Sequence, residues 1–155
     1  MQTHIPDPSF VAAHHEAGHV VAAWRLGIPI GFTSVDEKGN GVTRVSQFHS
    51  CTSMFRAVTQ CTVRNMALFA LAGDAAEQLV TRFVETDIAE PDYAISWFLA
   101  RKFRLDLAQL KEEAEQIILR EHETIVRIAS ELHRRRSLNS FDLALQRMNW
   151  LARGK

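Results

Sequence analysis

The sequence predicts a mainly helical protein of the α+β class, with one small β-hairpin and a long C-terminal helix. Apolar residues recur at helical spacing over most of the 155 residues, whereas β-branched residues alternate with polar ones between residues 30 and 48. Hydrophobic residues make up 46% of the chain, which is enough to build a core, and no repeat or low-complexity linker divides it. We therefore expect one domain over residues 1–155, with a core carrying the candidate site at 1–105 and a helical part at 106–155.

The first expected helix covers residues 8–26. Asp7 is a typical N-cap, and Pro8 then occupies the first helical position. Gly27, followed by Pro29, marks the C-terminal end. Apolar residues along the segment predict that most of this helix is buried: Phe10, Val11, Ala17, Val20, Val21 and Trp24.

Residues 30–48 are predicted to form the hairpin. Its strands are expected at 32–35 and 42–46, and the Gly-Asn-Gly sequence at the tip supplies the positive φ angles of the turn. Two interpretations of the hairpin remain open. One strand is an exposed edge to which an extended peptide could add, or the small sheet only shields one side of the core.

The rest of the chain is expected to be helical. A helix, or two abutting helices, should follow an N-cap at Ser53 and cover 54–83, with small residues at 72–76 that allow close approach to the first helix. After a loop at 84–91 we expect helices at 92–104, at 106–136 and at 141–152. Asp106 and Gln109 form a capping box for the long helix, and residues 138–140 form a turn and cap before the last one.

Composition excludes several classes of function. Eighteen basic and eighteen acidic residues cancel, so the chain has no general attraction to nucleic acid or to an anionic membrane. Cys51 and Cys61 are too few for a disulfide framework, which indicates free thiols in a reducing compartment. Residues 1–8 are not typical of a signal peptide, and no apolar stretch approaches the roughly 20 residues of a membrane span. We expect a soluble cytoplasmic protein without a nucleic-acid partner or membrane span.

The most informative motif is His15-Glu16-Ala17-Gly18-His19. On a helix, residues four apart lie on the same face, so the imidazoles of His15 and His19 can bind one metal ion. The Glu16 carboxylate can then take a proton from metal-bound water. Because a buried helix needs a partner for three such polar groups, we predict one Zn²⁺ per chain with Glu16 as the general base.

Two histidines leave a catalytic zinc site one protein ligand short. The position six residues after His19, where a metzincin has its third histidine, is Arg25. A thermolysin-like glutamate would fall at Asp36-Glu37, in the predicted turn. Glu77 and Asp92, near or within later helices, remain as candidates.

The chain resembles the peptidase domain of the FtsH-type zinc proteases, which are membrane-bound and ATP-dependent. The resemblance rests on His15 to Val21 (HEAGHVV), Leu71 to Glu77 (LAGDAAE), Glu90 to Ala94 (EPDYA) and the C-terminal pattern at 119–143. It implies a helical zinc peptidase in which Asp92, opening a later helix, is the third ligand. The alternative for Asp92 is a simple helix cap. Glu77 is the fallback ligand, or else a hydrogen-bond partner of a ligand or a residue that faces solvent.

The chain also departs from that family. It has no Gly-rich phosphate loop ending in Lys-Ser or Lys-Thr, and its segment between the aspartate helix and the long C-terminal helix is shorter than in the family. We therefore expect a stand-alone, ATP-independent zinc metallopeptidase that cleaves unfolded or flexible polypeptides. A homo-oligomer and a separate ATPase partner are both left open. The alternatives are a non-catalytic, zinc-stabilised module that binds peptides or proteins, and a zinc hydrolase of a non-peptide amide.

Overall fold

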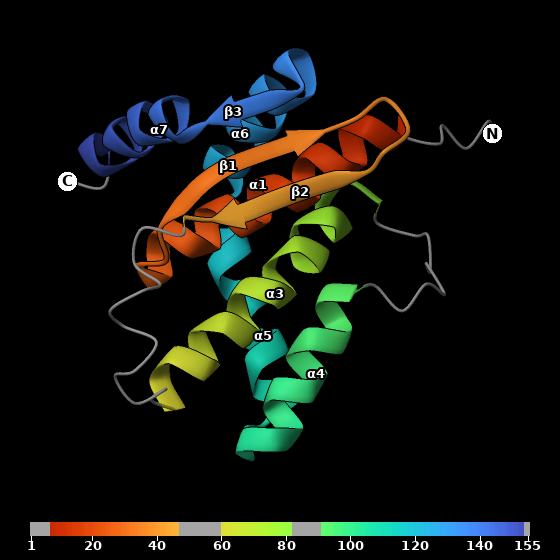
Figure 1. Ribbon diagram of the computed structural model, residues 1–155, viewed down its shortest axis with the longest axis vertical. Helices are drawn as coiled ribbons and strands as arrows, with labels where there is room; N and C mark the ends of the chain where they lie inside the picture. Colours follow the sequence, from red (N-terminus) through yellow and green to blue (C-terminus); the bar gives the residue numbers. More distant parts are fainter. Residues whose placement is uncertain (1–6, 47–59, 82–90, 154–155) are drawn as a thin grey trace.

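The computed structural model describes residues 7–46, 60–81 and 91–153 (Figure 1). Its elements, in chain order, are α1 (Pro8–Leu26), β1 (Ile30–Val35), β2 (Gly41–Val45), α3 (Gln60–Thr81), α4 (Pro91–Phe103), α5 (Leu107–Arg120), α6 (His122–Arg135), β3 (Ser137–Asn139) and α7 (Ser140–Arg153). The protein is mainly helical with one small antiparallel sheet, which confirms the predicted fold class. In these parts of the chain no helix is long and apolar enough to cross a membrane. The expected cap at Ser53, the thiol of Cys51 and the loop before Pro91 lie outside the described residues.

Helix α1 lies at the centre of the structure, between the sheet, α3 and α6 (Figure 1). Its ends are those that the sequence predicts. The Asp7 side chain accepts a hydrogen bond from the backbone N–H of Ser9 at 2.9 Å, and Gly27 ends the helix with φ 71°. Both caps satisfy backbone groups that the helix itself leaves unpaired, and most residues between them are buried.

Helix α3 approaches α1 through the small residues that the sequence places at 72–76. A methyl group added to Gly18 of α1 would lie 2.5 Å from the Ala72 carbonyl oxygen and 2.6 Å from Ala76 Cβ. Only glycine therefore fits at this crossing, and the close approach brings the side chains of α3 onto the histidine face of α1.

The sheet has the strand order β2-β1-β3, with antiparallel pairing throughout. The predicted hairpin forms β1 and β2, whereas β3 lies where the sequence predicts only a turn and cap. This three-residue strand pairs Leu138 with Thr33 of β1, and it is too short to show an alternating pattern. On its other side β1 pairs with β2, whose outer edge no strand covers within the described ranges.

The predicted single helix at 106–136 is wrong, because the structure divides it at Glu121 into α5 and α6. Its apolar periodicity continues through the break, so the sequence gives no sign of it. The division lets α5 pack on α3 while α6 packs on α1. The buried Glu121 carboxylate accepts hydrogen bonds from Arg25 of α1 and from Trp150 of α7, at 2.8 Å in each case, and so ties three elements together.

Candidate metal centre

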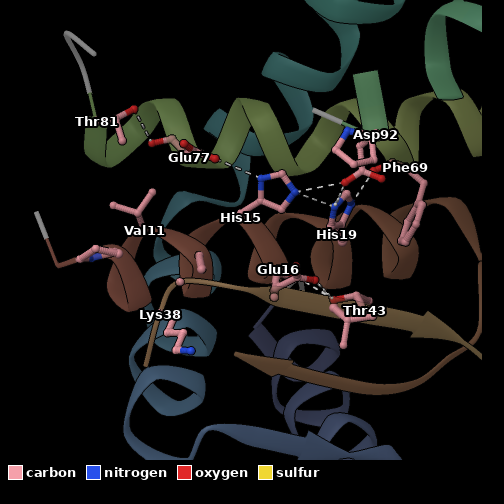
Figure 2. A pocket seen from close by; sticks show the side chains of 16 residues that line it. Val11, His15, Glu16, His19, Lys38, Thr43, Phe69, Glu77, Thr81 and Asp92 are labelled. Carbon is pink, nitrogen blue, oxygen red and sulfur yellow. Dashed lines mark hydrogen bonds and ion pairs between the residues drawn. The ribbon is translucent and has the colours of Figure 1, made fainter. Parts of the chain in front are cut away.

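Three ligand atoms from two helices converge at the candidate site (Figure 2). His15 and His19 point from the same face of α1, and their Nε2 atoms lie 3.1 Å apart. The Oδ2 atom of Asp92, in the first turn of α4, lies 3.2 Å from Nε2 of His15 and 3.1 Å from Nε2 of His19. The structure thus brings together the two histidines of the motif and the aspartate that the resemblance implies.

The second nitrogen of each ring fixes its tautomer. Nδ1 of His19 lies 2.8 Å from the Phe69 carbonyl oxygen, which can only accept, so this nitrogen carries the hydrogen. Nδ1 of His15 lies 3.2 Å from Oε2 of Glu77, a second acceptor. In the neutral rings both Nε2 lone pairs therefore face Asp92, as they do when a histidine ligates a metal and donates its other N–H to an oxygen.

This donor set fits a zinc ion. A tetrahedral site with bonds of about 2.0 Å separates neighbouring ligand atoms by about 3.3 Å, close to the spacing seen here. Gly73 of α3 lies directly over the pair of rings, and a methyl group at this position would collide with Nε2 of both histidines. Three acceptors facing one another need a cation or a proton between them, and His15, His19 and Asp92 could hold such a cation. Among the described residues no fourth ligand joins them, so one position of a tetrahedral site is left.

The surrounding carboxylates dominate the electrostatics of His15. Burial alone would lower its pKa, but hydrogen bonds with Asp92 and Glu77, and the charges of Glu16 and Asp74, raise the pKa to about 10. The Asp92 carboxyl shows the reverse. Burial favours its neutral form, yet the two histidines hold its pKa well below the usual range. The site therefore attracts positive charge before any metal binds.

Glu16 points from α1 toward β2, whereas the two histidines point toward α3 (Figure 2). Its Oε2 accepts a hydrogen bond of 2.6 Å from the Thr43 hydroxyl, and the side chain is buried. Burial raises the pKa of the Glu16 carboxyl, against the lowering effects of His19, Thr43 and His15. A raised pKa makes this carboxylate a stronger proton acceptor, as a general base requires.

One pocket of about 550 Å³ joins these groups. Its walls come from α1, the hairpin, α3 and the start of α4, and the candidate ligands and Glu16 all line it. Sixteen residues line it: Pro8, Val11, Ala12, His15, Glu16, His19, Lys38, Gly39, Gly41, Val42, Thr43, Phe69, Glu77, Thr81, Pro91 and Asp92. The pocket is large enough for a short stretch of an extended peptide beside the candidate ligands.

The other histidines in the described residues lie away from this site. His14 is buried on a different side of α1, where its Nδ1 lies 2.9 Å from the Phe10 carbonyl oxygen. His122 is exposed and His133 is half-buried on α6. Sequence reasoning missed the contributions of Thr43, Gly41, Gly73 and the Phe69 carbonyl. Of these, only Gly73 could have been found from the sequence, because it lies within the run of small residues at 72–76.

No protein-family model matches the chain, and a search of curated proteins found no match.

Proposed function

We propose that this chain is an ATP-independent zinc metallopeptidase of the FtsH type that hydrolyses peptide bonds in unfolded or flexible cytoplasmic polypeptides. One observation carries the proposal. Three ligand atoms lie 3.1–3.2 Å from one another, and the buried Glu16 lines the same pocket. A purely structural zinc site needs neither an open position nor a neighbouring base.

The proposed chemistry divides between the metal and Glu16. Zn²⁺ held by His15, His19 and Asp92 would supply a Lewis acid for the scissile carbonyl and lower the pKa of water. Glu16 accepts a proton from the attacking water and then donates it to the amine nitrogen that leaves. Thr43 donates to Oε2 of Glu16 and so holds the carboxylate in place for both proton transfers.

The form of the pocket favours a polypeptide substrate over a small amide. Gly41, Val42 and Thr43 of β2 line it, and β2 exposes its outer edge within the described part of the chain. An extended peptide can add to such an edge through backbone hydrogen bonds, which places successive peptide groups along the pocket without regard to sequence. Unfolded and flexible segments can adopt this extended conformation readily, hence the restriction to them.

Cleavage of casein by the purified protein tests the proposal. We expect zinc-dependent cleavage that a chelator stops and that ATP does not change. The Glu16→Gln variant should bind one zinc per chain but cleave about 10²–10⁴-fold more slowly, the usual contribution of a positioned base. Glu37→Gln, in the exposed hairpin turn, is the matched control and should cleave like the wild type.

The rival functions give different results in the same assay. One zinc per chain without cleavage by the wild type would favour a non-catalytic binding module. Cleavage of a small amide but not of casein would favour the non-peptide hydrolase. Failure to bind zinc would overturn the proposal altogether.

A further inference from the structure

We infer that Thr43 is a positioning residue that holds the Glu16 carboxylate in the orientation from which it accepts the proton of the attacking water. The inference rests on the proposed function and adds a residue to it that the motif does not contain. Thr43 lies on β2, 27 positions from Glu16 in the sequence, and its hydroxyl donates to Oε2 of Glu16 at 2.6 Å.

A second threonine gives this hydrogen bond its direction. The Oγ1 atoms of Thr33 and Thr43 lie 2.8 Å apart across the paired strands β1 and β2. A hydroxyl has one hydrogen, and Thr43 uses its own for Glu16, so Thr33 must be the donor to Thr43. Thr33 is fully buried and cannot turn to water instead. The hydrogens therefore run in one sense, from Thr33 through Thr43 to Glu16, and each bond strengthens the next.

The backbone of β2 closes the other side of the carboxylate. Gly41, two residues before Thr43 and thus on the same face of the strand, lies so close that a methyl group there would collide with Oε1 and come within 2.7 Å of Cγ of Glu16. The Glu16 side chain is seated between a hydroxyl that fixes one oxygen and a glycine that leaves room for the other. This arrangement restricts the rotation of the Glu16 side chain, which lines the pocket beside the two histidines.

A purely structural role for Thr43 would have a different signature. If the hydroxyl only satisfied a buried carboxylate, its removal would lower the free energy of unfolding and leave turnover by the folded protein unchanged. A positioning role predicts a loss in kcat with little change in KM, because the substrate still binds but the base is misaligned in the transition state.

The test compares Thr43→Val with Thr43→Ser. Valine keeps the shape and removes the hydroxyl, so we expect kcat for an unstructured peptide to fall about 10- to 100-fold, with KM within about twofold of the wild type. Serine keeps the hydroxyl and should restore kcat to within about threefold. Thr33→Val is the matched control in β1. It removes the supporting donor but leaves the Thr43 bond, and its effect on kcat should be smaller than that of Thr43→Val.

Crystal structures of the wild type and Thr43→Val, grown with and without zinc, provide a readout that needs no activity. We expect one Glu16 side-chain conformation in the wild type and more than one in the variant. A single, unchanged conformation in Thr43→Val, or an unchanged kcat, would refute the positioning role. Absence of cleavage by a wild type whose Glu16 is ordered by Thr43 would instead count against the proposed peptidase and leave the positioning contact intact.

Discussion

The two sides of α1 place neighbouring histidines in opposite electrostatic surroundings. His14 and His15 are adjacent and both buried, with exposed fractions of 1% and 7%. His14 faces α6, where burial, with the charges of His122 and His133, lowers its pKa against the raising effect of the Phe10 carbonyl. His15 faces α3 and α4, where carboxylates raise its pKa.

Burial therefore does not decide what a histidine on this helix does. The residues that the tertiary fold brings to each side decide it. On one side His14 hydrogen-bonds to a carbonyl of its own helix and packs on the ring of Phe10, with centroids 4.4 Å apart. On the other side Glu77 and Asp92 approach the two nitrogens of His15 from opposite directions, the arrangement expected of a metal ligand.

The strongest test of this contrast removes each histidine in turn. His15→Ala should weaken zinc binding by more than about 100-fold, beyond the usual cost of losing an outer hydrogen-bond partner of a ligand. His14→Gln should bind zinc as the wild type does but lower the free energy of unfolding by about 1–3 kcal/mol, because a buried hydrogen bond is disturbed. Zinc titration with a competing chelator and urea unfolding measure the two effects. A large loss of zinc affinity in His14→Gln would show that the two sides are not separate.

The sequence predicts those parts of the fold that short-range chemistry decides. Asp7 and Gly27 end α1 because capping depends on residues next to one another. The same is true of the hairpin, whose turn and alternating strands lie within one short stretch. The break at Glu121 could not be predicted, since it depends on Arg25 and Trp150, which are far away in the chain.

The candidate site divides in the same way. His15, Glu16 and His19 belong to one turn of helix, so their spacing alone suggests a shared metal and a base. From the residues alone Glu77 and Asp92 remained equal candidates for the third ligand, and only the resemblance favoured Asp92. In the structure Asp92 faces both Nε2 atoms while Glu77 contacts Nδ1 of His15. The contact of Thr43 with Glu16 could not be predicted from the sequence, because it depends on where β2 crosses α1 in space.

A smaller effect sharpens the distinction between ligand and supporting residue on the α3 side. Glu77→Gln should weaken zinc binding by about 10- to 100-fold, because it removes a charged acceptor for Nδ1 of His15 but no ligand. Asp92→Ala, the comparison variant, should weaken zinc binding more than Glu77→Gln does, because it removes a proposed ligand atom. Both are measured by the same chelator competition. If Glu77→Gln proves the more damaging of the two, Glu77 and not Asp92 is the third ligand.

The smallest expected effect is a difference in titration between adjacent rings in the zinc-free protein. His15, with its pKa raised to about 10, should stay protonated at neutral pH, whereas His14 should be neutral there and gain its proton only below its ordinary pKa of 6.5. Nitrogen chemical shifts of ¹⁵N-labelled histidines, followed from pH 5 to 11, would resolve the two rings. Zinc should displace the His15 proton and leave His14 unchanged.

The same difference determines how the stability of the zinc-free protein depends on pH. A raised pKa on His15 stabilises the folded state fully below 6.5, and this contribution is lost as the pH rises through about 10. The lowered pKa of His14 acts at the other end, since the unfolded chain takes up its proton first and stability falls as the pH drops below 6.5. Replacing His14 with glutamine should remove the loss of stability at acidic pH and keep the loss of stability at alkaline pH. If both losses persist in that variant, the two sides of α1 do not titrate independently, and the separation proposed for them fails.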